Sequence, residues 1–333
     1  DILFVGAKGR MEMQKIPLLG YKIIGLWIDG IQRKLDVRNL VFPIKLFISL
    51  IHSFIIIINY RPNIVIGTGG FASGPIVFVA ALLGVPTLIH EQNSFPGLSN
   101  RLLGRIAKKI CVAYKNMELY FPPKKIVQTG NPIRKGLKKN VDKITSASYF
   151  NLKNGRTTIL IIGGSLGATP INEVVKNNLD RLSTCQIIWQ TGDFNYKKYS
   201  FLCSKFKNIR VFKFIERMDL AYSLADIVIS RAGAIAIAEI CFLEKPSLLI
   251  PSPYVSEDHQ NKNAKHLEKE LACLIVEEQD LKKEFLVHIE KLITNTNYRN
   301  QIGRNAKKIS MHNASINIIR EIKQMAPYIF NNS

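Results

Sequence analysis

The chain has 333 residues, 47% of them hydrophobic, and a formal net charge of +21. The length predicts two domains of roughly 150 residues each. The basic charge suits a phosphorylated substrate or an anionic membrane surface. Nucleic acid is not expected as a partner, because the sequence shows no zinc-finger, RNP-like or helix-turn-helix motif.

Short apolar strands alternate with helical patterns, which predicts an α/β protein with parallel sheets and crossover helices. The strands expected in the first part are Ile2–Val5, Ile23–Trp27, Ile64–Gly67, Thr87–His90, Lys109–Ala113 and Ile126–Thr129. After a polar, Lys- and Asn-rich stretch, the strands expected are Thr158–Ile162, Gln186–Gln190, Val211–Phe214, Asp226–Ser230, Ser247–Ile250 and Ala272–Val276. Two such halves predict two Rossmann-like domains that face each other across a ligand-binding cleft.

The five cysteines, Cys111, Cys185, Cys203, Cys241 and Cys273, show no short paired spacing. Scattered thiols of this kind suit a reducing cytoplasm and predict neither a disulfide framework nor a metal site.

A segment at 32–55 combines basic and apolar residues. The apolar runs of the chain are expected to be too short and too interrupted to span a bilayer, which needs about 18–20 residues. No signal peptide is visible, since the chain opens on "DILFVG". The segment therefore predicts a helix at the membrane interface, with a buried crossover helix as the alternative. Its basic residues are Arg33, Lys34, Arg38 and Lys45, and its apolar ones are Val41, Phe42, Leu46, Phe47 and Leu50.

Five polar or glycine-rich motifs follow expected strands. They are "GTGGFASGP" (67–75), "HEQN" (90–93), "GGSLGA" (163–168), "SRAGAIAIAEI" (230–240) and "EDHQNKNA" (257–264). A glycine-rich turn that leads into a helix presents backbone N–H groups to an anion. In open α/β sheets, functional groups gather at the carboxyl ends of the strands.

Two further motifs are "ILFVGAKGRMEMQKIP" and "TGNPIR". In their order and spacing, all these motifs resemble those of the MurG family. The resemblance implies a GT-B fold and an inverting, metal-independent N-acetylglucosaminyltransferase without cofactors. It implies UDP-N-acetylglucosamine (UDP-GlcNAc) as donor and lipid I, undecaprenyl-pyrophosphoryl-MurNAc-pentapeptide, as acceptor in peptidoglycan synthesis. Such enzymes are peripheral proteins of the cytoplasmic face of the inner membrane. Two alternatives remain open: another GT-B enzyme, such as a UDP-GlcNAc 2-epimerase or a glycolipid glycosyltransferase, or a non-catalytic nucleotide-sugar-binding fragment.

The resemblance also implies roles for residues of the second half. Ser165 lies against the diphosphate, Glu239 accepts hydrogen bonds from the ribose, and the backbone of Ile215 reads the uracil. Gln260 contacts sugar hydroxyls. Asn172 and Ala234 are further nucleotide-sugar positions, although Asn172 could instead serve helix capping or packing.

In the first half, Asn93 is implied to touch the GlcNAc, while His90 and Glu91 support the acceptor side. A purely structural His90 is the alternative. Arg134 matches a nucleotide-proximal arginine. Two departures from the family stand out: Phe71 replaces a frequent Tyr and Ala236 a frequent Thr, each removing a hydroxyl.

The family opens with a strand and a "GGTGGH"-type loop that carries its usual candidate base, and neither has a counterpart here. No catalytic base is therefore assigned, and the chain as given is expected to be inactive for that reason. The expected domains are 1–134 on the acceptor and membrane side, a linker at 135–154, a UDP-GlcNAc-binding domain at 155–318 and a helical tail at 319–333 that packs back on the first domain.

Overall fold

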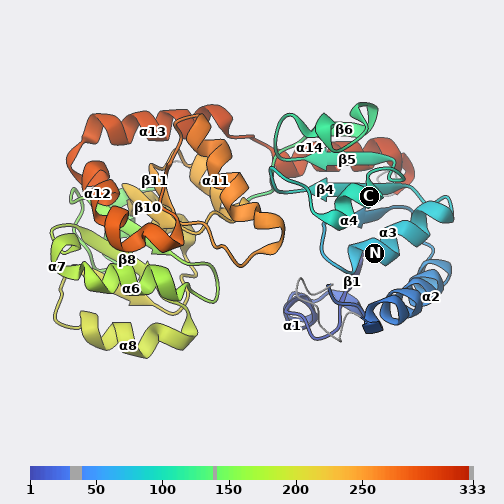
Figure 1. Cartoon of the computed structure of the whole chain (residues 1–333), viewed down its shortest axis with the longest axis horizontal. Coiled ribbons are helices and arrows are strands. Elements are labelled where there is room, and N and C mark those ends of the chain that lie inside the picture. The colour runs from blue at the N-terminus through green and yellow to red at the C-terminus, as the bar shows by residue number, and fades with distance from the viewer. Residues whose placement is uncertain (31–39, 138–140, 330–333) are drawn as a thin grey trace. The chain divides into compact units, whose positions relative to one another are not determined.

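The computed structural model describes residues 1–30, 40–137 and 141–329. The chain divides into two compact units, which are described separately (Figure 1). Unit 1 comprises residues 1–130 and 313–333, and unit 2 comprises residues 131–312.

Unit 1 contains two parallel sheets. In the first, β1 (Leu3–Ala7) pairs with β2 (Lys22–Leu26), and in the second β3 (Val65–Gly67), β4 (Thr87–Glu91), β5 (Lys109–Val112) and β6 (Ile126–Gln128) follow one another in chain order. The helices are α1 (Glu12–Leu18), α2 (Phe42–Tyr60), α3 (Ser73–Leu82), α4 (Leu98–Leu103) and α14 (Ala314–Met325), with short 3-10 turns at Met117–Leu119, Pro123–Lys125 and Pro327–Ile329.

The C-terminal helix α14 belongs to unit 1. Its Met325 packs with Leu88 of β4 and Cys111 of β5 in a small apolar core. Lys109 also lies 3.4 Å from Glu321, joining β5 to α14 by an ion pair. Helix α14 thereby covers part of the sheet of the first unit (Figure 1).

Unit 2 is built on one six-stranded parallel sheet with the order β12-β11-β10-β7-β8-β9. The strands are β7 (Thr158–Ile162), β8 (Gln186–Gln190), β9 (Ile209–Phe212), β10 (Ile227–Ser230), β11 (Ser247–Leu249) and β12 (Leu274–Ile275). Numbered within the unit, this is the Rossmann order 3-2-1-4-5-6. Its order reverses between β7 and β10, which defines the point where such sheets bind ligands.

Helices cover both faces of this sheet. They are α5 (Lys143–Tyr149), α6 (Thr169–Asn177), α7 (Leu179–Leu182), α8 (Asp193–Cys203), α9 (Met218–Leu224), α10 (Ala234–Phe242), α11 (His259–Lys269), α12 (Leu281–Thr294) and α13 (Thr296–Ile309), with 3-10 turns at Ser256–Asp258 and Glu278–Asp280. The core is apolar and continuous, with Trp189, Tyr199 and Phe285 among its largest buried side chains.

All twelve predicted strands form, each within two residues of its predicted ends. The strand predicted at Val211–Phe214 begins and ends two residues earlier, at Ile209–Phe212. The reason is its partner: β8 ends at Gln190, which pairs with Phe212, so residues 213–214 have no strand beside them.

The prediction that the apolar runs are too short to span a membrane is wrong for α2. This helix runs for 19 residues with a mean hydropathy of 1.9, long and apolar enough to cross a membrane by length and composition. Ser49, His52 and Ser53 lie within this apolar run, and the mean hydropathy of the segment is 1.9 with them included. Only 22% of the segment is buried inside the protein.

The faces of α2 differ in their surroundings. Ser49, Ser53, Ile56 and Ile57 are buried, and the Ser49 hydroxyl donates to the Trp27 carbonyl at 3.1 Å. The opposite face is an exposed apolar stripe, defined by Ile44, Phe47, Ile48, Ile51, Phe54, Ile55 and Ile58. These positions recur every three or four residues, so they lie along one side of the helix.

The basic residues predicted beside this helix are only partly described. Lys45 is not a free cation, because its ammonium lies 2.7 Å from Asp29 and 5.5 Å from the Trp27 ring centroid. Arg33, Lys34 and Arg38 lie outside the described residues.

Candidate active site

The candidate site of unit 2 lies where the strand order reverses. The loop after β7 runs into α6, and the loop after β10 runs into α10. The residues that precede these helices are Ala168 and Gly233, and no side chain caps either helix in the described part of the chain. Both helix starts therefore present backbone N–H groups and the positive end of a helix dipole.

The loop after β7 packs against a second turn, backbone to backbone. Gly167 has a φ of +78°, and a Cβ placed there would lie 1.9 Å from the Thr191 carbonyl oxygen. Gly192 has a φ of +80°, and its Cβ would lie 2.0 Å from the Leu166 oxygen. Only glycine fits at these two positions. Ser165, at the tip of the same loop, is exposed.

Gln190, at the end of β8, joins two loops of the site. Its amide nitrogen donates to the Gly164 carbonyl at 2.8 Å, and its amide oxygen accepts from the Ile215 N–H at 2.8 Å. The Ile215 N–H is therefore engaged, and its carbonyl is the backbone group left for a ligand. Gln190 was not predicted as a site residue; its position at a carboxyl strand end in this sheet was the available signal.

Asn172 lies inside the protein, with 1% of its surface exposed. Its amide nitrogen donates to the Thr191 carbonyl at 2.9 Å, and its amide oxygen accepts from the Trp189 indole at 3.0 Å. Both ends of the amide are thus bonded to protein. In this structure Asn172 holds the turn on which the glycine-rich loop packs.

Glu239, on the second turn of α10, is buried and doubly bonded. Arg134 donates to one carboxylate oxygen at 2.6 Å, and the Tyr222 hydroxyl donates to the other at 3.3 Å. Burial and the Glu239 charge raise the pKa of Tyr222 well above its usual range, so its hydroxyl keeps the proton that it donates. Arg134 and Glu239 are predicted from the sequence, whereas Tyr222 is not, because it sits among apolar residues of α9.

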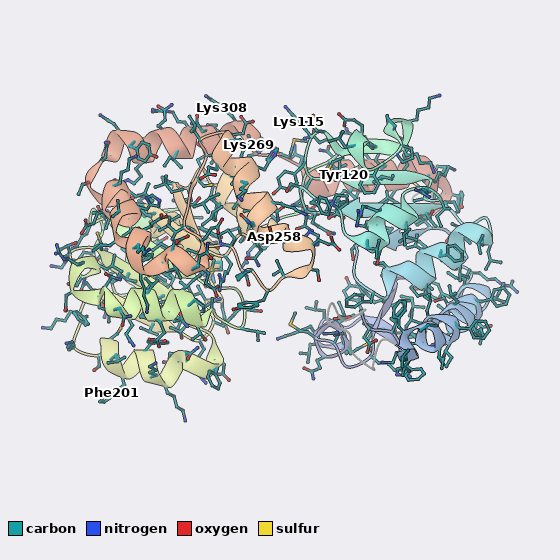
Figure 2. The ribbon with its side chains drawn as sticks, viewed as in Figure 1. Lys115, Tyr120, Phe201, Asp258, Lys269 and Lys308 are labelled. Atoms are coloured by element: carbon teal, nitrogen blue, oxygen red, sulfur yellow. The ribbon has the colours of Figure 1, made fainter. Side chains whose placement is uncertain are left out.

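Gln260 lies on the first turn of α11, and its amide oxygen accepts from the Ser252 N–H, in the loop before this helix, at 2.9 Å. This leaves the amide nitrogen of Gln260 as a donor for a ligand. Asp258, at the start of α11 (Figure 2), and Glu257 before it both adopt left-handed backbone with a φ of +54°. Two such residues in a row are costly without glycine and often occur at ligand-binding loops.

Arg231 ties this loop to the start of α10. Its guanidinium donates to the carbonyls of Ile250 and Pro251 at 3.1 and 3.0 Å and forms an ion pair with Glu278 at 2.5 Å. Ala234 and Ala236 are half-buried on the first turn of α10. Since neither has a hydroxyl, the backbone provides the hydrogen-bonding groups of that turn.

In unit 1, Glu91 organises the loop after β4. One carboxylate oxygen accepts from the backbone and side-chain nitrogens of Asn93 at 2.9 and 3.1 Å. The other accepts from the Gly97 N–H at 3.2 Å and the Asn100 amide at 2.8 Å. Glu91 is 1% exposed. Its hydrogen bonds orient Asn93 and hold the loop after β4 in place.

His90 is likewise held on both sides. One ring nitrogen, Nε2, lies 3.0 Å from the Gly130 carbonyl, and the other accepts from Gln92 at 3.2 Å. A carbonyl only accepts, so Nε2 carries the proton. Burial lowers the pKa of His90, although the Gly130 hydrogen bond opposes the shift. His90 is therefore a neutral, structurally engaged histidine.

Phe71 follows β3 and lies under a neighbouring cation. The Arg10 guanidinium is 5.8 Å from its ring centroid, and a Cβ on Gly30 would lie 2.3 Å from the ring. The Phe71 ring thus packs closely on the backbone at Gly30. Unlike the Tyr that is frequent in the family, it has no hydroxyl.

The described geometry agrees with comparisons to known proteins. Residues 1–112 match the glycosyltransferase family 28 N-terminal domain, and residues 158–319 match the glycosyltransferase family 28 C-terminal domain. With the strand order and helix starts above, these matches define a glycosyltransferase of the GT-B class.

The chain belongs to glycosyltransferase family 28 and, within it, to the MurG family. A relative from Flavobacterium psychrophilum, named UDP-N-acetylglucosamine--N-acetylmuramyl-(pentapeptide) pyrophosphoryl-undecaprenol N-acetylglucosamine transferase, is 46% identical over 96% of this chain and 88% of its own length. A relative of the same name from Christiangramia forsetii is 44% identical over 98% of this chain and 89% of its own length. The crystal structure of Acinetobacter baumannii MurG is 28% identical, with a TM-score of 0.75 over 96% of this chain and 90% of its own.

Proposed function

We propose that this chain is an inverting glycosyltransferase that moves GlcNAc from UDP-GlcNAc to undecaprenyl-pyrophosphoryl-MurNAc-pentapeptide, converting lipid I to lipid II in peptidoglycan synthesis. The names of the relatives at 46% and 44% identity support this reaction. The structural observation that carries it is the pair of uncapped helix starts, α6 and α10, at the point where the sheet order reverses.

The diphosphate of UDP fits these helix starts. Backbone N–H groups and the helix dipoles compensate negative charge, and Ser165 adds an exposed hydroxyl donor at the tip of the first loop. As the bond to GlcNAc breaks, charge builds on the diphosphate, so donors in fixed positions lower the barrier. Charge compensation by the protein backbone makes the proposed reaction independent of metal.

Polar groups of unit 2 bind the other parts of the nucleotide sugar in this proposal. Glu239 accepts the ribose hydroxyls beside the Arg134 and Tyr222 bonds, since each carboxylate oxygen can accept more than one hydrogen bond. The Ile215 carbonyl accepts from the uracil N–H. The free amide nitrogen of Gln260 binds a hydroxyl of the GlcNAc.

No base is assigned to the attack by the acceptor hydroxyl. Glu91 has both oxygens saturated by four donors, and both nitrogens of His90 are engaged. We propose that these two residues position the 90–97 loop, with Asn93 on it.

The alternative activities rest on fold alone. A UDP-N-acetylglucosamine 2-epimerase structure has a TM-score of 0.62 with this chain at 10% identity, covering 98% of this chain and 88% of its own. Such a likeness shows a shared fold and does not favour that reaction.

The acceptor carries a lipid tail, so the enzyme must reach the membrane. We propose that the exposed apolar stripe of α2 lies in the interface of the inner membrane, on its cytoplasmic face, and holds the protein there as a peripheral enzyme. The buried face of α2 packs against the rest of unit 1, which suits a helix lying along a membrane better than one crossing it. Phe78 and Leu82, on the neighbouring helix α3, are also exposed.

Transfer of labelled GlcNAc from UDP-GlcNAc to a lipid I analogue tests the reaction. The chain should be compared with the same chain preceded by a family-type first strand and "GGTGGH" loop, both with EDTA present. Formation of lipid II by the extended protein in EDTA is expected. Release of free GlcNAc epimer, or activity that requires added Mg²⁺ or Mn²⁺, would contradict the proposal.

A further inference from the structure

Three adjoining cavities run along the edge of the unit 2 sheet where its strands begin, opposite the edge that carries the glycine-rich loops. The first, about 620 Å³, lies beneath β9 and β8. The second, about 180 Å³, shares Arg156 with it and lies beneath β7 and β10. The third, about 330 Å³, shares Asp226 and Arg299 with the second and reaches β11. Together they form one groove, called here the basal groove.

The basal groove is strongly basic. The first cavity has four basic lining residues and no acidic one. The two acidic residues of the groove are already compensated: Asp226 pairs with Lys143 at 3.0 Å and accepts from the Thr158 N–H at 3.0 Å, and Glu244 pairs with Lys307 at 3.0 Å. The basic lining residues are Lys143, Lys153, Arg156, Lys207, Arg210, Lys245, Arg299 and Arg304.

Burial and a neighbouring cation both act on Lys245. Its ammonium donates to the Ala225 carbonyl at 2.7 Å. Burial, and then the charge of Lys143, lower the pKa of Lys245 to about 8. An anion in the groove would relieve this repulsion.

The form of the groove indicates the form of its ligand. From β9 to β11 it crosses four strand intervals of about 4.8 Å, so it is about 19 Å long, the length of about six residues of extended peptide. Four of its cations are arginines. Arg210 already donates to backbone carbonyls through all three of its guanidinium nitrogens, so the forked donors that match carboxylates are those of Arg156, Arg299 and Arg304. Phe206 is the one aromatic residue in its lining, whereas grooves for single-stranded nucleic acid rely on several stacking aromatics.

We propose that the basal groove is a docking site for an extended acidic segment of a partner protein. The segment would carry Asp or Glu at most of about six positions. The groove lies at the opposite edge of the sheet from the proposed UDP site, so docking would leave that site open.

A fluorescein-labelled hexaglutamate peptide tests the proposal by anisotropy with the full chain in about 0.15 M salt. The variant Lys153→Glu/Lys207→Glu reverses two exposed charges of the first cavity. The control Lys282→Glu/Lys283→Glu reverses two exposed charges on α12, outside the groove, and changes the net charge equally. Binding should fall at least about tenfold in the groove variant and less than about threefold in the control. UDP affinity should stay unchanged in both.

Three outcomes would overturn the proposal. Equal losses in the two variants would show attraction to the overall charge alone. Failure of hexaglutamate to bind better than hexaglutamine would exclude the acidic peptide. Tighter binding of tripolyphosphate or oligo-dT, abolished by the groove variant, would identify a different class of ligand. UDP binding measured alongside keeps these outcomes separate from failure of the proposed transferase function.

Discussion

Arg134 and Glu239, 105 residues apart in the chain, meet in an ion pair with Nε 2.6 Å from Oε1. Arg134 is half-exposed, whereas Glu239 is buried. A charged hydrogen-bonded pair of this kind fixes the orientation of a buried carboxylate. The pair therefore prepares Glu239 as an acceptor at the proposed ribose position.

Glu239→Ala should weaken UDP binding by about 1–3 kcal/mol, because charge-assisted hydrogen bonds to the ribose are lost. Isothermal calorimetry measures the effect, with a thermal melt to verify folding. Tyr222→Phe is the control, since it keeps the carboxylate and removes one donor to it; its effect should be smaller. Unchanged UDP affinity in folded Glu239→Ala would place the ribose elsewhere.

Gln190→Leu should lower UDP affinity by about tenfold, because the Gly164 carbonyl and the Ile215 N–H lose the amide that holds their loops together. Discrimination between UDP and CDP should fall as well, since the Ile215 backbone would no longer be fixed. The matched control is Gln186→Leu, at the other end of β8. Gln186 is also buried and bonded, to Lys153 and Thr158. The Gln186→Leu substitution should lower the stability of the protein while leaving UDP affinity and selectivity intact. Equal losses of UDP affinity in the two variants would refute the positioning role of Gln190.

Gly167→Ala should be far more destabilising than Gly164→Ala. Both glycines have positive φ, which costs an alanine about 1–2 kcal/mol. At Gly167 the added Cβ would also meet the Thr191 oxygen at 1.9 Å, whereas at Gly164 no atom lies within 4 Å. Thermal melts of the two variants compare them directly. A similar loss in both would mean that the loop and turn separate easily.

Protonation of His90 should lower the free energy of unfolding in mild acid. Burial lowers its pKa below the ordinary 6.5, so the unfolded chain binds this proton more readily than the folded one. The contribution of His90 is complete above pH 6.5 and is lost as the pH falls from there toward its folded pKa, by at most about 1.4 kcal/mol per pH unit. His90→Gln should flatten the melting temperature between about pH 7 and 5.5. An equally steep decline in the variant would exclude His90 as the cause.

Substituting the α2 stripe should release the protein from membranes. Phe47→Glu/Ile51→Glu places charges where apolar side chains would enter the interface, and vesicle sedimentation should show at least about tenfold weaker binding. Phe201→Glu is the control: Phe201 is 81% exposed and projects from α8 in unit 2 (Figure 2). Binding should require anionic lipid and weaken with salt.

Substituting the predicted cations refines that test. Lys45→Gln should matter little, since Lys45 pairs with Asp29, whereas joint substitution of Arg33, Lys34 and Arg38 by Gln should weaken binding further. Vesicle binding that survives the stripe substitutions would move the membrane contact to another surface.

The sequence by itself determined the strands, the fold class and the positions of the glycine-rich turns. These are local signals: a short apolar run bounded by glycine or polar residues needs no knowledge of its neighbours to be recognised as a buried parallel strand. The order of the motifs was then sufficient to predict the family.

Only the tertiary structure decided which polar groups meet. The bonds of Gln190 to two loops, of Asn172 to Trp189 and of Tyr222 to Glu239 depend on how strands and helices far apart in sequence pack together, and no local pattern encodes them. The same holds for α2, where composition alone cannot tell which face is covered. Packing decides whether a polar side chain is free for a ligand or already bonded within the protein.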